Sequence, residues 1–284
     1  MKKILLPTDF SSNAWNAISY ALNLFKNEEC IFYFLHTYVP PFYRMDYMIG
    51  GPAMSGLPDT MLEITLTGLD KTLEDVEKHF PNEKHTYKKI ASFNMLTDEI
   101  NDITDREDID IIIMGTQGAT GAKQIFLGTN TVFVIRKAKI PVLAIPENYN
   151  FEGIENILFP SDYLTLYKRR ELKPLLYFAK QHNASITSLH VTEEGELTEA
   201  QEKHRDFLQE CLEEVPCQCK ELYQEKMPGA VYDYLSVNNY QLLAMMNKKH
   251  SFLERMLLKQ NVEDIGFHVD VPFLVLPDTS TITD

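Results

Sequence analysis

The sequence has few cysteines and no long apolar run. Four cysteines in 284 residues are too few for a disulfide framework. No apolar stretch approaches the roughly 20 residues that a transmembrane helix needs. The apolar run after Lys3 is ended by Pro7 and is too short for the core of a secretion signal. We therefore expect a cytoplasmic protein that does not span a membrane.

Positive charge is also scarce. The chain has 27 Lys and Arg against 41 Asp and Glu, which gives a formal net charge of -14. Nucleic acids and anionic membrane surfaces repel such a chain, so we predict neither as a partner. The charge does not exclude a local anion site, because backbone N–H groups at the start of a helix bind phosphate without basic side chains.

Several motifs of known chemistry are absent. Cys217 and Cys219 are one residue apart, whereas zinc and redox pairs usually have two residues between them, so we interpret both as strand residues. The chain has no Gly-Lys-Ser/Thr of a P-loop, and no Gly-x-Gly-x-x-Gly follows the first apolar strand. We predict no metal cluster and no catalytic residue.

The chain does contain one pattern twice. Residues 4–10 (ILLPTDF) match residues 157–163 (ILFPSDY), and residues 111–146 align without a gap with residues 242–277. A repeat of this size indicates two domains rather than the units of a solenoid. The predicted domains span residues 1–147 and 153–278.

Strand and helix patterns alternate within the first repeat. Short apolar runs predict strands, and apolar residues spaced on one helical face predict helices. The predicted strands cover residues 3–8, 30–36, 86–93, 110–114 and 142–145. The predicted helices cover residues 61–80, 96–105 and 129–138, after a first helix capped by Ser11 or Ser12. The alternation predicts an α/β fold of two tandem doubly wound, Rossmann-like domains, each with a mainly parallel five-stranded sheet and four helices.

The most unusual stretch is MGTQGATGAKQIFLGTNT, residues 114–131. Two residues separate Gly115 from Gly118, and nine separate Gly118 from Gly128, which precedes Thr129. Glycine lets a backbone pass close to a bulky anion, and the N–H groups of a first helical turn bind phosphate. At the strand ends of a doubly wound sheet, the set predicts a nucleotide site. For Gly115 alone we favour the alternative, a purely structural turn.

The first repeat closely resembles the ATP-binding branch of the universal stress protein family. That family's nucleotide motif is Gly-x2-Gly-x9-Gly-Ser/Thr, which the stretch matches fully, and Pro7-Thr8-Asp9-Phe10-Ser11 resembles its first-strand ending. The resemblance extends over nearly the whole chain as two tandem copies. It implies a stress-response module that binds ATP, or AMP or ADP, with any Mg²⁺ held by the phosphates.

The same resemblance implies a contact for each site residue. Thr8 and Asp9, which follow Pro7, would lie near the adenosine, the backbone of Thr37 would face adenine, and Met114 would pack near the sugar and base. The ribose and phosphate contacts would come from Gly115, Gln117, Gly118, Gly128, Thr129, Asn130 and Thr131. Many members of the family have His or Arg in place of Gln117.

Two nearby residues have structural alternatives. Asp9 could instead cap the first helix, because Asp is a strong capping residue. We interpret His36 as packing against the sheet rather than touching a ligand, since His190 follows the corresponding strand of the second repeat.

The second repeat lacks the glycines. Met246, Lys249, Lys259 and Gln260 align with Gly115, Gly118, Gly128 and Thr129. Long side chains in these places would block a triphosphate, and lysines would attract an anion only as flexible point charges. We therefore predict a silent second domain. Members of the family commonly dimerise through their last strands, so the resemblance implies that residues 273–276 pair with residues 142–145 in an intramolecular pseudo-dimer, which would cover two sheet edges. A homodimer of whole chains and an unidentified protein partner are left open.

Two other functions compete with nucleotide binding alone. A slow ATPase or phosphotransferase would need a base, a metal carboxylate and a cation at the γ-phosphate, and the motif contains Lys123 but no acidic residue. A ligand-free scaffold would not explain why only one repeat has the motif. The Pro- and Gly-rich segment 39–57 is either a cover over the strand ends or a surface loop without a role.

Overall fold

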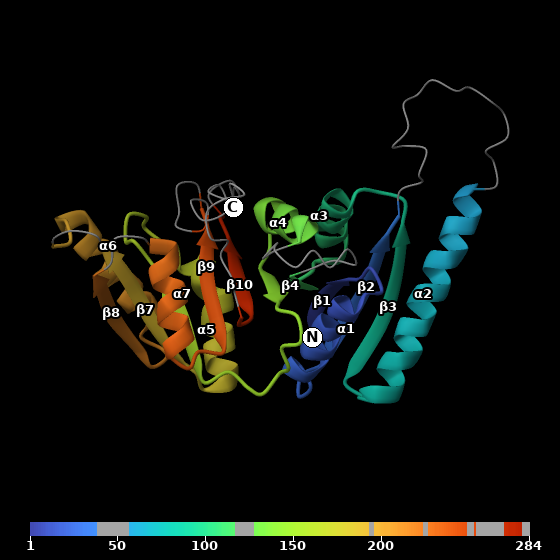
Figure 1. The fold of residues 1–284 in the computed structure, drawn as a ribbon, viewed down its shortest axis with the longest axis horizontal. Coiled ribbons are helices and arrows are strands. Elements are labelled where there is room, and N and C mark those ends of the chain that lie inside the picture. Colours follow the sequence, from blue (N-terminus) through green and yellow to red (C-terminus); the bar gives the residue numbers. More distant parts are fainter. Residues whose placement is uncertain are drawn as a thin grey trace, which may run out of the picture.

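The structure is a computed structural model, and it describes residues 1–38, 57–116, 128–192, 196–223, 227–248, 253 and 270–279. Helices cover both faces of one large sheet (Figure 1). The strands are β1 Lys2–Pro7, β2 Cys30–Thr37, β3 His85–Ser92, β4 Ile111–Gly115, β5 Val142–Ile145, β6 Asn156–Pro160, β7 Ser185–Thr192, β8 Cys217–Tyr223, β9 Leu242–Asn247 and β10 Phe273–Pro277. The helices are α1 Ser12–Leu24, α2 Leu57–His79, α3 Leu96–Glu107, α4 Thr129–Lys137, α5 Arg169–His182, α6 Glu199–Leu212 and α7 Met227–Val237.

The ten strands form one sheet in the order β3-β2-β1-β4-β5-β10-β9-β6-β7-β8. All pairs within each half are parallel, whereas β5 and β10 are antiparallel, with Leu143 opposite Leu274. The predicted α/β class, the five parallel strands of each half and the pairing of the last strands are confirmed, and this pairing joins the two sets of five into one sheet. The two halves are thus related by an approximate two-fold axis between β5 and β10.

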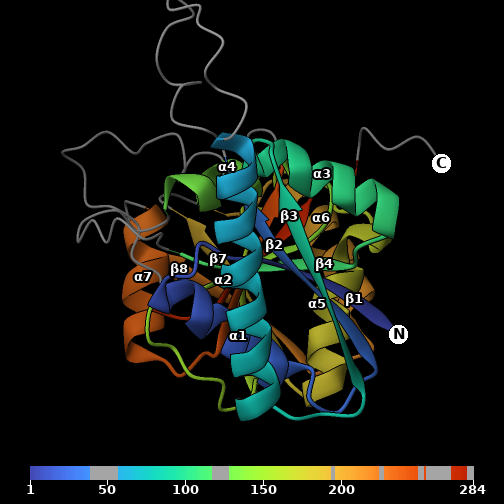
Figure 2. The same cartoon turned by 90° about the vertical axis from the view of Figure 1, so that its right-hand side faces the viewer.

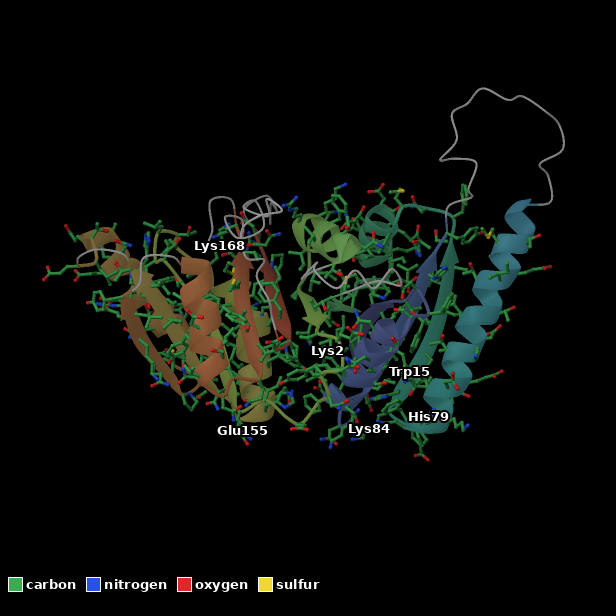
Figure 3. All side chains as sticks on the ribbon, in the orientation of Figure 1. Lys2, Trp15, His79, Lys84, Glu155 and Lys168 are labelled. Atoms are coloured by element: carbon green, nitrogen blue, oxygen red, sulfur yellow. The ribbon has the colours of Figure 1, made fainter. Side chains whose placement is uncertain are left out.

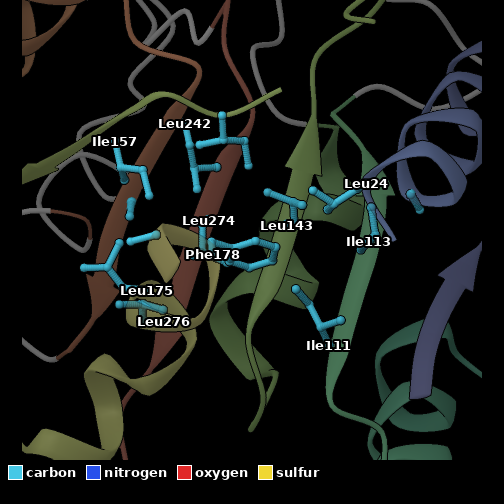
Figure 4. Packing of buried hydrophobic residues seen from close by; sticks show 14 of the residues in the cluster. Leu24, Ile111, Ile113, Leu143, Ile157, Leu175, Phe178, Leu242, Leu274 and Leu276 are labelled. Carbon is cyan, nitrogen blue, oxygen red and sulfur yellow. The ribbon is translucent and has the colours of Figure 1, made fainter. Parts of the chain in front are cut away.

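Two apolar layers lie on opposite faces of this sheet, because successive strand residues point to opposite sides. One layer packs the strands against α1, α2, α5 and α6, and the other packs them against α3, α4 and α7. Figure 4 shows the first layer crossing the boundary between the halves, where Leu143 and Leu274 lie near Phe178 of α5. The core is therefore continuous from one half to the other.

The predicted elements of the first half are observed within a few residues of their expected ends. Ser11 caps α1, since its Oγ accepts a hydrogen bond from the Ala14 N–H at 3.2 Å. Helix α2 lies beside the outer strand β3 (Figures 1 and 2). The expected fourth helix of the second repeat and the segment 39–56 lie outside the described residues.

Polar contacts between α5 and the start of the chain also join the two halves. The hydroxyl of Tyr177 in α5 donates to the carboxylate of Glu28, and the Lys2 ammonium lies 4.3 Å from the centre of the Tyr177 ring. Figure 3 shows Lys2 between the two halves, and Trp15 of α1 near His79 of α2 in the first half. Within the part of the chain that the structure describes, no helix is both long and apolar enough to cross a membrane.

Candidate functional site

The candidate site lies where the strand order of the first half reverses. Strand β1 has β2 on one side and β4 on the other, so the connections after β1 and β4 leave the sheet in opposite directions. In doubly wound folds ligands bind at this point, beyond the carboxyl ends of the strands. The described candidate residues lie here: Pro7 at the end of β1, Thr8 and Asp9 after it, Thr37 at the end of β2, Met114 and Gly115 at the end of β4, and Gly128, Thr129, Asn130 and Thr131 at the start of α4.

The chain makes a tight turn after β1. The Thr8 N–H donates to the Leu35 carbonyl at 2.8 Å, and the Thr8 hydroxyl oxygen accepts the Phe10 N–H at 3.1 Å. Asp9 is exposed, and its Oδ1 accepts the Ser11 N–H at 3.1 Å. Because Ser11 is the capping residue of α1, the alternative of Asp9 as the helix cap is wrong. The turn holds the Asp9 side chain at the open end of β1.

His36 fixes this turn from the neighbouring strand. Its Nδ1 lies 2.7 Å from the carbonyl oxygen of Thr8, and its ring stacks on Phe10 with a centroid distance of 4.4 Å. Phe10 has a left-handed backbone (φ 63°), an uncommon conformation for a bulky side chain. Its ring lies so close to Gly68 of α2 that a Cβ there would be 2.6 Å from it. His36 therefore supports the turn after β1 through its contacts with Thr8 and Phe10.

Gly115 ends β4 against the first turn of α1. A Cβ at this position would lie 2.6 Å from Nδ2 of Asn13, whose side chain is buried. The hydroxyl of Thr131 donates to the Gly115 carbonyl at 2.8 Å, and Thr131 is also buried. Packing therefore explains this glycine, as the structural alternative expected. Asn13 is absent from the residues expected at the site, since no local pattern in the sequence links α1 to the end of β4.

The start of α4 offers N–H groups to an anion. Gly128 occupies the N-cap position, where no side-chain cap is found, and its N–H donates to the Thr116 carbonyl. Thr129 and Asn130 in the first turn are exposed. The first turn has no acidic residue, and Arg136 and Lys137 lie in the last turn. The positive end of the helix dipole is thus accessible at the edge of the site.

The remaining candidate residues differ in accessibility. Met114 is buried in the apolar layer that faces α3 and α4, and Thr37 is half-buried. Gln117 and Gly118 lie outside the described residues, as do Lys249, Lys259 and Gln260 of the second repeat. Among the residues with described positions, no three His, Cys, Asp or Glu side chains come together as metal ligands.

The turn after β1 recurs after β6. The Ser161 hydroxyl oxygen accepts the Tyr163 N–H at 3.1 Å, and Asp162 Oδ1 accepts the Leu164 N–H at 3.0 Å. His190 Nδ1 lies 2.9 Å from the Ser161 carbonyl oxygen, and its ring stacks on Tyr163. Tyr163 also has a left-handed backbone (φ 52°). This turn therefore belongs to the fold of both halves, whether or not glycines follow β4 or β9.

Comparison with known proteins decides the family. The sequence profile of the Universal stress protein family matches residues 1–146. The chain belongs to the universal stress protein family. Universal stress protein MJ0577 of Methanocaldococcus jannaschii is 34% identical over 154 residues, 51% of this chain and 94% of that relative. Universal stress protein MJ0531 of the same organism is 29% identical over 145 residues, 51% of this chain and 81% of that relative.

Solved structures extend the likeness in fold to the second half. A universal stress protein from Archaeoglobus fulgidus covers 97% of this chain and 98% of its own, with a TM-score of 0.69 and 19% identity. A putative universal stress protein from Pseudomonas aeruginosa covers 98% of this chain and 93% of its own, with a TM-score of 0.56 and 13% identity. At these identities the match shows that this universal stress protein shares the fold of two-domain members.

Proposed function

We propose that the first half binds an adenine nucleotide, ATP in particular, and that the chain acts as a nucleotide-dependent stress-response module. The observation that carries the proposal is the convergence of two features at the carboxyl ends of neighbouring strands. These are the exposed Asp9 after β1 and the accessible first turn of α4 at Thr129, which follows β4. They lie at the reversal point of the sheet, where nucleotides bind in doubly wound folds.

The chemistry of these features suits the two ends of a nucleotide. The N–H groups and hydroxyl of the α4 first turn, at Thr129 and Asn130, would bind phosphate, and the helix dipole would favour its negative charge. The Asp9 carboxylate and the Thr37 backbone would lie on the adenosine side, as the family resemblance implies. A Mg²⁺ ion would be held through the phosphates.

The second half acts in this proposal as a partner that binds no nucleotide. We propose residues 1–147 and 153–278 as the two domains and the cytoplasm as the location. A slow ATPase or phosphotransferase is the alternative activity. Phosphate release from ATP, measured alongside binding, separates it from a pure binding module.

The test is calorimetric titration of ATP and AMP, with magnesium, into the full chain. We expect about one ATP bound per chain. The variant Gly118→Lys plus Gly128→Lys, which copies the second repeat, should lose binding. Gly229→Lys is the matched control, because Gly229 is exposed on α7 with no neighbouring atom within 4 Å of an added Cβ. A wild-type chain that takes up neither nucleotide contradicts the proposal.

A further inference from the structure

The second half has a small cavity at its counterpart of the candidate site. Its volume is about 10 Å³, which is room for about one water molecule. Its lining includes Pro160, Ser161, Asp162, Met245, Met246 and Lys248. These residues correspond in the repeat to Pro7, Thr8, Asp9, Met114, Gly115 and Gln117. The described residues at the strand ends of the second half thus leave a cavity of only this size between them.

Lys248 enters this cavity and is held there. Its Nζ lies 3.0 Å from Oε2 of Glu171 and donates to the Leu166 carbonyl at 3.2 Å. The side chain of Lys248 is 9% exposed, and that of Glu171 is 0% exposed. This lysine is therefore a fixed, buried cation, unlike the flexible point charges expected of lysines after β9.

The Glu171 carboxylate has further partners on both oxygens. Oε2 accepts the Lys168 N–H at 2.9 Å, and Oε1 accepts the N–H and the hydroxyl of Thr279 at 3.3 and 3.0 Å. Arg170 also donates to the Thr279 carbonyl at 2.7 Å. The carboxylate thereby connects the start of α5, the chain after β9 and the chain after β10. A buried charge needs such complete hydrogen bonding.

The positions in the first half that correspond to this pair hold neither a lysine nor a glutamate: Gln117 aligns with Lys248. Glu171 is the third residue of α5, and the third residue of α1 is Ala14. The connection from β6 to α5 is also longer than that from β1 to α1, and its Tyr167 is buried with its hydroxyl 2.8 Å from the Ser161 hydroxyl. The carboxylate and the longer connection are therefore additions specific to the second half.

We propose that the Glu171 carboxylate is an internal counter-ion for Lys248. By neutralising this lysine, it prevents external anions from binding at the strand ends of the second half. A buried ammonium whose counter-charge is removed needs another anion nearby. Without the Glu171 carboxylate, the vacated space beside Lys248 is a binding site for a small carboxylate such as acetate. The proposal concerns the second half alone and does not depend on nucleotide binding in the first.

The test is chemical rescue of Glu171→Ala, which copies Ala14, in the full chain without nucleotide. Urea unfolding is measured in sodium acetate and in sodium chloride of equal ionic strength. We expect acetate to raise the folding equilibrium constant of the variant by at least about tenfold over chloride, and that of the wild type by less than about twofold. Glu171→Ala with Lys248→Met, which has no cation to neutralise, should show no acetate response.

Other outcomes are also decisive. If Glu171→Ala does not fold in chloride, its refolding yield in acetate is the readout, and the double variant should fold in either salt. An equal response of wild type and Glu171→Ala to acetate overturns the proposal. So does a variant that is stable and indifferent to acetate, because Asp162, which lines the same cavity, would then neutralise Lys248.

Discussion

Asp9 and Asp162 follow the same strand in the same turn but have different surroundings. Asp9 is exposed, whereas Asp162 is buried beneath a longer connection and beside the Lys248–Glu171 pair. Both halves keep the Thr/Ser-Asp turn and the His that supports it. Because both halves have this turn, the turn alone is not evidence of a ligand site. The residues that follow β4 and β9, in contrast, differ between the halves.

The same comparison holds one strand further. Gly115 leaves room for the buried Asn13 side chain of α1. Its counterpart Met246 carries a long side chain that is buried in the apolar layer facing α5 and α6. Substitutions at the positions where the halves differ test these differences, and truncation of the buried Met246 should have the largest effect on stability.

Met246→Ala removes that core side chain from the second half. Met246 is 4% exposed, so its truncation should leave a cavity and lower the free energy of unfolding by about 2–5 kcal/mol. ATP binding by the first half should not change. Urea unfolding and calorimetric titration measure the two effects. Met95→Ala is the control, because Met95 is 61% exposed and should cost little; a similar loss in both variants would contradict tight packing at Met246.

Gly115→Ala should lower the free energy of unfolding by a smaller but measurable amount. The added methyl would meet the buried Asn13 side chain, and overpacking of this kind costs about 1–3 kcal/mol. In the background of Asn13→Ala the same change should cost less, which a double-mutant cycle of unfolding free energies measures. Gly229→Ala, with open space around it, should not destabilise. Additive effects at positions 13 and 115 would contradict the contact.

Thr131→Val copies Val262 of the second repeat and removes a buried hydroxyl. Loss of its hydrogen bond to Gly115 should lower the unfolding free energy by about 1 kcal/mol. Thr129→Val, at an exposed position in the same turn, should leave stability unchanged and weaken ATP binding. Denaturation and titration of both variants test this division. A reversed pattern would assign the phosphate contact to Thr131 instead.

The smallest expected effect is a pH dependence of stability. It comes from His85 at the start of β3 and has no counterpart at the same position of the second half. Burial lowers the pKa of His85 below its ordinary 6.5, and Val215 stands at the corresponding position of the second half. The fold favours neutral His85, so this contribution is complete above pH 6.5 and is lost as the pH falls through the lowered pKa. Unfolding free energies at pH 7 and 5.5 should therefore differ more in wild type than in His85→Val. Equal differences would contradict it.

The sequence predicted local structure and repeat symmetry well. Periodicity located the strands and helices, because a buried face imposes its spacing on nearby residues. The pairing of β5 with β10 followed from the family resemblance, since members commonly dimerise through their last strands and two equivalent sheet edges can cover each other. The sequence ended the first strand at Thr8 and offered Ser11, Ser12 or Asp9 as the cap of the first helix, and the structure assigns the cap to Ser11.

Contacts between distant segments were not predictable in the same way. Asn13 lies against Gly115, and Glu171 lies against Lys248. The positions of these residues in the sequence do not predict either contact. Alignment drew attention to the lysines at positions 249 and 259, whereas the buried cation is their neighbour Lys248. Charge alone does not reveal whether a lysine is solvated or paired, because that depends on which helix start faces it.

The antiparallel pairing of β5 with β10 has a consequence for regulation. Because one chain supplies both halves, dilution does not separate them. A dimer of separate subunits would respond to its own concentration, whereas pairing within one chain does not depend on how much of the protein is made.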